Sequence, residues 1–345
     1  MSYASDRAST GGTRARDAGP ASGSARPAGR LPDFFIVGHP KCGTTALYEM
    51  LREHPQVYMP EGKEPWFFAP ELHERTPPRP EGTPRTLEQY MALFAHAKPE
   101  QRVGEATAQY LWSKTAAHRI ARAQPRARIV ALLREPASFL RSLHLQFLQA
   151  YVETESDLRR ALELEDERRR GRAIPRHTYW PQALMYSEHV RYVEQLRRYE
   201  AVFGRERILV LIYDDFRRDN EGTLREVLRF IEVDEHHPIP ARTANPTVRP
   251  RSQRLNSLVH ATSVGRGSTS LAVKGAFKAI VPQRVRRRAL YAVQRHLVFT
   301  EPDPPDAALM RELRVRYKSE VEALSEYLGR DLTALWGYDT AAERS

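Results

Sequence analysis

Short runs of apolar residues recur along the chain and are separated by longer stretches with helical spacing. Three of these runs are too short for helices and are rich in strand-forming residues, which predicts buried strands. A still shorter run around Val103 predicts one more strand. The predicted strands cover residues 33–37, 103–105, 128–133 and 207–213.

The stretches between these runs favour helices. In the first of them, Leu47, Tyr48 and Leu51 recur at helical spacing after Thr44, before His54-Pro55 ends the pattern. Strands that alternate with helices are typical of βαβ units. The sequence therefore predicts an α/β fold with a mainly parallel sheet flanked by helices. The further predicted helices cover residues 136–150, 187–203, 221–231 and 306–328.

Other segments depart from this alternation. Residues 1–30 are rich in Ser, Ala, Gly, Pro and Arg and are expected to form a disordered basic arm. Residues 31–340 are expected to form a single domain. Within it, the Pro-rich residues 73–85 indicate an exposed loop, and residues 153–172 mix acids and arginines as a solvated helix does. Residues 256–299 are basic and only weakly periodic.

Charge and composition narrow the class of protein. The 345 residues carry a formal net charge of +11, which attracts anions such as nucleic acids, acidic membranes or phosphorylated small molecules. The single cysteine, Cys42, excludes an intramolecular disulfide and fits a reducing compartment. No run approaches the roughly 18 apolar residues of a membrane span. The N-terminal residues lack the apolar core of a secretory signal, so a cytoplasmic location is expected.

The segment 38–45, which reads Gly-His-Pro-Lys-Cys-Gly-Thr-Thr, joins the end of a predicted strand to the start of a predicted helix. This geometry directs free backbone N–H groups and the positive end of a helix at one point, which suits a phosphate or sulfate. Lys41 adds a full charge, and Thr44 and Thr45 add hydroxyl donors. A glycine turn with a threonine cap would explain the glycines alone, but not the lysine and two threonines beside them.

The spacing within this segment separates two classes of anion-binding loop. In the nucleoside-triphosphate loop, lysine follows the last glycine directly. Here Lys41 precedes Gly43 by two residues, which counts against an ATPase or kinase. The segment resembles the 5′-phosphosulfate loop of sulfotransferases that use 3′-phosphoadenosine-5′-phosphosulfate (PAPS). The resemblance continues to residues 63–68, Lys-Glu-Pro-Trp-Phe-Phe, and is closest to the branch that contains heparan-sulfate and many bacterial sulfotransferases.

A second motif supports the same resemblance. The chain reads Leu-Arg-Glu-Pro at 133–136, and Ser142 follows Arg134 by eight residues. In the family, an arginine and a serine at these places bind the 3′-phosphate of the donor. The planar fork of an arginine suits phosphate oxygens, and a serine further into the helix can add a donor. An Arg-Glu pair that caps a helix would explain Arg134 alone, but not both motifs together.

The resemblance implies a P-loop-like three-layer core, PAPS as co-substrate and a set of site residues. Lys41 would stabilise the leaving phosphate oxygen. Glu64 would act as the general base, since a partly buried carboxylate beside aromatic residues is a better base. His39 and His144 are rival bases, although packing roles are expected for both. The implied donor-binding residues are Gly38, Lys41, Cys42, Gly43, Thr44, Thr45, Arg134 and Ser142.

The acceptor is less constrained. Ala106 stands where heparan-type enzymes commonly carry a lysine that holds acidic sugars, which argues against a heparan-like polyanion. Glu105 beside it is a candidate for lining the acceptor cleft. The expected acceptor is a small molecule, a carbohydrate or a glycolipid with a hydroxyl or amine.

Two alternatives stay open at this point. A P-loop nucleotide kinase or NTPase would need Mg²⁺ ligands, for which Asp214-Asp215 is the candidate pair. The basic cluster at residues 284–288 raises nucleic-acid or membrane binding. Aromatic residues are not interleaved with these arginines, so no nucleic-acid partner is expected, and a peripheral membrane contact stays open. No His/Cys cluster has metal-ligand spacing, so no metal is expected.

Overall fold

A computed structural model describes residues 29–72, 83–176, 178, 180–240, 249–250, 299–300 and 302–339. Its centre is a five-stranded sheet in the order β2-β3-β1-β4-β5, in which every neighbouring pair is parallel. The predicted α/β class with a mainly parallel sheet is confirmed. The strands are β1 (Phe34–Gly38), β2 (Val57–Tyr58), β3 (Arg102–Ala106), β4 (Arg128–Leu133) and β5 (Ile208–Ile212). A separate antiparallel pair joins β6 (Arg249–Pro250) to β7 (Phe299–Thr300).

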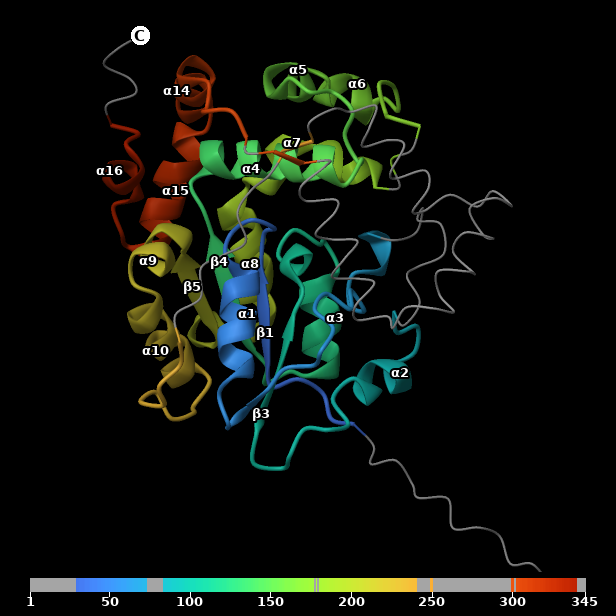
Figure 1. The fold of residues 1–345 in the computed structure, drawn as a ribbon, viewed down its shortest axis with the longest axis vertical. Coiled ribbons are helices and arrows are strands. Elements are labelled where there is room, and N and C mark those ends of the chain that lie inside the picture. The colour runs from blue at the N-terminus through green and yellow to red at the C-terminus, as the bar shows by residue number, and fades with distance from the viewer. Residues whose placement is uncertain are drawn as a thin grey trace, which may run out of the picture.

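Helices cover both faces of the sheet, with α1 in front and α8 behind in Figure 1. The α14–α16 group lies beside α4 and α8. The main helices are α1 (Thr44–Arg52), α2 (Leu87–Ala92), α3 (Ala116–Ala123), α4 (Pro136–Gln149), α5 (Leu158–Glu163), α6 (Glu165–Arg169), α7 (Tyr186–His189), α8 (Tyr192–Phe203), α9 (Tyr213–Arg218), α10 (Asn220–Phe230), α14 (Ala307–Arg316), α15 (Lys318–Leu328) and α16 (Leu332–Trp336). Short 3₁₀ turns lie at Pro70–Leu72, Ala108–Tyr110, Pro181–Leu184 and Arg205–Arg207.

The core explains why the short apolar runs are strands. All five residues of β1 are buried, because helices pack on both faces of the central strand. β5 ends at Ile212, and Tyr213 begins α9 rather than extending the strand. The helix predicted over 187–203 is two helices, α7 and α8, with a break at Val190 and Arg191. The helix predicted over 306–328 likewise breaks at Tyr317.

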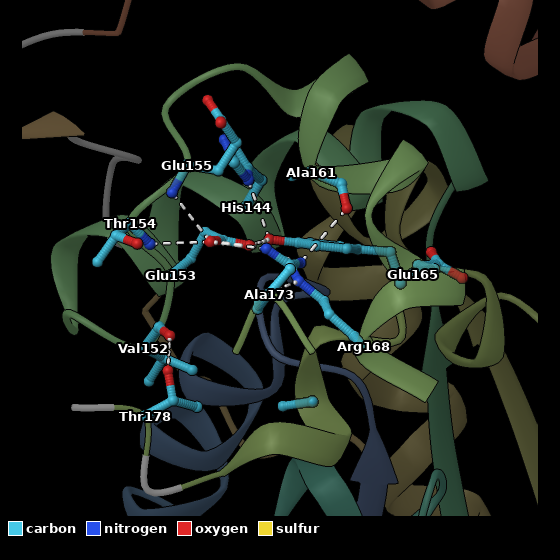
Figure 2. A network of polar contacts seen from close by, with 12 residues as sticks. His144, Val152, Glu153, Thr154, Glu155, Ala161, Glu165, Arg168, Ala173 and Thr178 are labelled. Carbon is cyan, nitrogen blue, oxygen red and sulfur yellow. Dashed lines mark hydrogen bonds and ion pairs between the residues drawn. The ribbon is translucent and has the colours of Figure 1, made fainter. Parts of the chain in front are cut away.

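The prediction of a solvated helix at residues 153–172 holds for most of its charged side chains, which are exposed or partly exposed, but is wrong for three of them. The segment forms two short helices, α5 and α6, and three of its charged residues are buried: Glu153, Glu165 and Arg168. Figure 2 shows Arg168 pointing at Glu153 beneath this segment. Their side chains are 1% and 0% exposed and form an ion pair at 2.8 Å. Pairing allows these charged side chains to be buried, so a high density of charged residues in the sequence does not show that they are exposed.

The carboxylate of Glu153 is fully engaged. It accepts hydrogen bonds from the backbone N–H groups of Thr154 (2.8 Å) and Glu155 (2.9 Å) and from the hydroxyl of Tyr186 (3.2 Å). That hydroxyl also lies 2.9 Å from Nδ1 of His144 on α4. The ion pair therefore joins two parts of the 153–172 segment, and the Tyr186 hydroxyl links Glu153 to α7 and to His144 on α4.

Replacing Arg168 by methionine is expected to lower the free energy of unfolding by about 3–5 kcal/mol, because it leaves the Glu153 carboxylate buried without its cation. Arg170→Met is the matched control, since Arg170 pairs with Glu167 at the exposed surface. That control should cost about 1 kcal/mol or less. Denaturant titration of both variants measures the difference, and equal costs would contradict the assigned role of the buried pair.

Several expectations concern residues that the structure does not describe. They include most of the basic arm at 1–30, most of the loop at 73–85, and the cluster at 284–288. The assignment of 31–340 to one domain stays a prediction. In the described part of the chain, no helix is both long enough and apolar enough to cross a membrane.

Candidate donor and acceptor site

The turn between β1 and α1 lies at the carboxyl edge of the sheet and requires both of its glycines. Gly38 has φ 142°, and a Cβ there would lie 2.5 Å from the carbonyl oxygen of Leu132. Gly43 has φ 91°, and a Cβ there would lie 3.0 Å from the Phe216 ring. No side chain caps the first turn of α1, and that turn carries no acid. The N–H groups at this helix end therefore face the turn, as an anion site requires.

Two cations meet at this turn. Nη1 of Arg134, which follows β4, donates a hydrogen bond to the backbone oxygen of Lys41 at 3.1 Å. Burial and the nearby Arg134 guanidinium both lower the pKa of Lys41. The Arg134 guanidinium also lies 4.9 Å from the centroid of the Tyr213 ring, just after β5. Positive charges held together in this way are stabilised by a bound anion.

Helix α4 brings Ser142 to the same side as Arg134. Nε of Arg134 donates to Oγ of Ser138 at 3.0 Å. Ser138 lies three residues before Arg141 and four residues before Ser142, so both residues lie one turn along α4 from Ser138. Burial and the nearby Arg134 also lower the pKa of Arg141. Arg134 and Ser142, which the sequence pairs, thus lie on one side of α4 with a second arginine.

The remaining donor-loop residues differ in what they can offer. Cys42 is fully buried, and burial raises the pKa of its thiol to about 12, so only its backbone can serve a ligand. Thr44 is 3% exposed, and its hydroxyl accepts a hydrogen bond from Lys63. Thr45 is exposed at the next position of α1.

The candidate base lies close to this loop. The backbone N–H of Glu64 donates to the oxygen of Ala106 at 2.9 Å, which fixes Glu64 to the carboxyl end of β3. Its side chain is 29% exposed, as the expected partial burial requires. Nζ of Lys63 lies 2.8 Å from Oε1 of Glu64 and 3.1 Å from Oγ1 of Thr44. Lys63 therefore joins the predicted base to the donor loop.

The two histidines that are rival candidates for the base are buried, and each has a hydrogen-bond partner. Nε2 of His39 lies 2.7 Å from Oε1 of Gln195, and burial lowers its pKa to about 3. The ring nitrogens of His144 contact the hydroxyl of Tyr186 and, at 3.2 Å, the backbone oxygen of Ser156. Both histidines pack in the interior, as expected.

Glu105 is enclosed and does not line a cleft. It is 0% exposed and accepts hydrogen bonds from the hydroxyls of Thr107 (2.6 Å) and Tyr90 (2.8 Å). Burial, with a smaller contribution from Glu64, raises the pKa of Glu105 to about 7. The expectation that Glu105 faces an acceptor is therefore wrong, because its carboxyl group is covered.

The raised pKa of Glu105 predicts a pH dependence of stability. Between pH 4.5 and about 7, the folded protein binds more protons at this site than the unfolded chain, so stability falls as pH rises through that window. Glu105→Gln should remove this fall. Relative to wild type, the free energy of unfolding of the variant should therefore rise by up to about 3 kcal/mol between pH 4.5 and pH 8. Urea titrations at both pH values measure it, with the exposed Glu100→Gln as control. A constant difference between wild type and Glu105→Gln would contradict the assignment.

The aspartates that a kinase would need are engaged elsewhere. Asp215 pairs with Arg330 and, at 2.6 Å, with Arg218. Oδ2 of Asp214 accepts a hydrogen bond from Nε1 of Trp336 at 3.0 Å. These contacts tie α9 to the C-terminal helices.

Sequence reasoning missed four residues of this site: Lys63, Ser138, Arg141 and Tyr213. Spacing along α4 could have found Ser138, which lies one turn before Ser142, and Arg141, which lies three residues after Ser138. Tyr213 follows a strand end, where a parallel sheet gathers its site residues. The contact between Lys63 and Thr44 joins a loop to the start of α1, and nothing in the sequence indicates it.

Comparisons with known proteins agree with this geometry. The family described as "Sulfotransferase family" matches residues 32–237. Carbohydrate sulfotransferase 15 of Homo sapiens is 26% identical over 256 residues, which cover 59% of this chain and 44% of that protein. Membrane-associated sulfotransferase kil1 of Dictyostelium discoideum is 32% identical over 106 residues, 31% of this chain and 21% of that protein. The chain thus spans less than half the length of these curated relatives.

A solved structure extends the likeness to the fold. The crystal structure of a sulfotransferase from Alicyclobacillus acidocaldarius superposes with a TM-score of 0.61 and 28% sequence identity. The match covers 88% of this chain and 98% of that one. The P-loop-like core that the two motifs imply is therefore confirmed.

Proposed function

The chain belongs to the sulfotransferase family, and on that premise we propose that it transfers the sulfonate group of PAPS to a hydroxyl or amine of a carbohydrate-containing or small-molecule acceptor. The observation that carries this proposal is the meeting of Lys41 and Arg134 at the uncapped start of α1. PAPS, which carries a 5′-phosphosulfate and a 3′-phosphate, needs such a concentration of charge and N–H donors.

The proposed donor pose follows from these contacts. The 5′-phosphosulfate lies on the α1 turn, where Lys41, the backbone N–H groups and the hydroxyls of Thr44 and Thr45 can reach it. The 3′-phosphate lies against α4, where Arg134, Ser142 and Arg141 share one side. Cys42 contributes through its backbone alone, since its thiol is buried.

In the proposed reaction, an acceptor oxygen or nitrogen attacks sulfur in line. The new bond to sulfur forms as the bond between sulfur and the phosphate oxygen breaks, and the phosphate keeps that electron pair. Lys41 stabilises the charge that develops there. Glu64 takes the acceptor proton, for which it lies close enough to the loop through Lys63. The charges of Lys41 and Arg134 do the work that Mg²⁺ does in a kinase, so turnover should survive chelation.

The proposed acceptor class rests on the relatives. Carbohydrate sulfotransferase 15 is named for carbohydrate sulfation, which favours a carbohydrate or glycolipid over other small molecules. Ala106 supplies no cation beside Glu64, which favours a neutral sugar over a polyanion. Radiolabelled PAPS with a panel of neutral and sulfated saccharides, in the presence of EDTA, tests both points. Transfer to sulfated glycans alone would contradict the choice of a neutral acceptor.

Arg134→Ala tests the donor assignment. The variant should bind PAPS about tenfold or more weakly, since a charge-assisted contact with the 3′-phosphate is lost. Its affinity for adenosine 5′-phosphosulfate, which lacks that phosphate, should change much less. Calorimetry with both ligands measures the preference, and Arg126→Ala, at the opposite edge of the sheet, is the control. An Arg134→Ala protein that keeps the full preference for PAPS would overturn the assignment.

A further inference from the structure

We propose that Lys63 is a further residue of the transfer reaction, which holds Glu64 beside the donor loop and binds an oxygen of the sulfonate being transferred. This inference rests on the proposed function and adds a residue to it. The sequence motif assigns no role to Lys63, and its contacts are visible only in the folded chain.

The position of Lys63 is defined by two contacts, one with helix α1 and one with its neighbour Glu64. Its ammonium donates to Oγ1 of Thr44 at 3.1 Å, in the first turn of α1, and to Oε1 of Glu64 at 2.8 Å. Its side chain is only 16% exposed. The ammonium thus stands between the hydroxyl expected to contact the donor and the carboxylate expected to take the proton.

The Lys63 ammonium has one more N–H group than its two contacts use. A protonated lysine has three N–H donors, and the contacts with Thr44 and Glu64 use two of them. The third donor, together with the full positive charge, is available to an anionic oxygen next to Thr44. The group that the donor loop is proposed to hold at that place is the sulfonate.

Glu64 keeps one carboxylate oxygen for chemistry. Oε1 accepts a hydrogen bond from Lys63, and in the described part of the chain no hydrogen bond is made to Oε2. During transfer, the acceptor proton passes to Oε2 while Lys63 keeps all of its own protons. Protonation neutralises Glu64, so the charge of Lys63 then acts wholly on the sulfonate oxygens.

The backbone holds this arrangement in a strained form. Glu64 and Trp66 have φ of 63° and 57°, in the left-handed region that side chains other than glycine rarely adopt. The hydrogen bond from Glu64 N–H to Ala106 secures the strained turn. Strain of this kind clusters at functional sites, where surrounding contacts maintain it. An ordinary surface Lys-Glu pair would need neither the strain nor the hydroxyl of Thr44.

The test compares two ligands that differ by the sulfonate alone: PAPS and adenosine 3′,5′-bisphosphate. In calorimetry, Lys63→Met should weaken PAPS binding about tenfold and bisphosphate binding less than about twofold. Lys63→Arg keeps the charge and should restore most of the PAPS affinity. Lys98→Met, at an exposed position, is the matched control and should change neither ligand. A purely structural role would shift both affinities alike.

The outcomes separate this inference from the function on which it rests. If wild type binds neither ligand, the proposed function fails. If wild type binds both and Lys63→Met leaves their affinity ratio within about twofold of wild type, Lys63 has no contact with the sulfonate and the inference is overturned. If Lys63→Met does not fold, Lys63→Gln, which keeps a hydrogen-bond donor without the charge, is measured by the same criterion.

Discussion

Lys41→Ala is expected to lower kcat by about 10²-fold or more and to weaken PAPS binding as well. Lys41 stands in the turn before α1, where burial and the Arg134 guanidinium disfavour its positive charge and therefore lower its pKa. A bound phosphosulfate favours that charge, so Lys41 contributes in the ground state. Charge that develops on the leaving phosphate oxygen strengthens the contact in the transition state, and the loss of one such donor typically costs about 10² to 10³ in kcat.

Steady-state kinetics with labelled PAPS, combined with calorimetry, separates the two effects of Lys41→Ala. Lys98→Ala removes an exposed lysine elsewhere and should leave both quantities unchanged. A fall in PAPS affinity with normal kcat would mean that Lys41 binds the donor equally in both states and does not stabilise the leaving group. Unchanged PAPS affinity and unchanged kcat would show that Lys41 is not part of the donor site.

Glu64→Gln is expected to lower turnover by about 10²-fold or more, in the range of a lost general base. Glutamine keeps the shape of the side chain and can still accept a hydrogen bond from Lys63, but it cannot take a proton. PAPS affinity should change little, because Glu64 is proposed to contact the acceptor and not a phosphate of the donor. Turnover and calorimetry on one preparation therefore distinguish the role of Glu64 from that of Lys41.

Glu61→Gln is the matched control for Glu64→Gln, since Glu61 is an exposed acid in the same loop. It should keep normal turnover. Near-normal turnover in Glu64→Gln would exclude Glu64 as the base. Glu105 and His144 would not replace it directly, because both side chains are buried and hydrogen-bonded in the interior.

The framework of the site could be predicted from the sequence, because it is formed by residues that lie close together in the chain. Gly38 and Gly43 mark a turn that other residues cannot form without a clash, and Lys41 lies between them. The strand that ends before Arg134 and the helix that holds Ser142 follow from apolar spacing over a few residues. The structure contains the elements that these local patterns predict, namely β1, β4 and α4.

The parts that sequence reasoning missed depend on contacts between distant residues. The contact of Lys63 with Thr44 joins a loop to the start of α1, and the ring of Tyr213 reaches Arg134 from the start of α9. The burial of Glu153 and Arg168 depends on their pairing, while the charge pattern around them is that of a solvated helix. A charged side chain is stable in the interior only when it is paired, and its partner can be distant in the sequence. A local sequence pattern does not reveal such a pair.

The most direct test of the central claim is calorimetric titration of the wild-type protein with adenosine 3′,5′-bisphosphate and with adenosine 5′-monophosphate, both in EDTA. The two ligands differ only in the 3′-phosphate that Arg134 and Ser142 are proposed to bind. The bisphosphate should bind about tenfold or more tightly than the monophosphate, and added Mg²⁺ should change neither value. Equal affinities for the two ligands, or binding that appears only with Mg²⁺, would contradict the account.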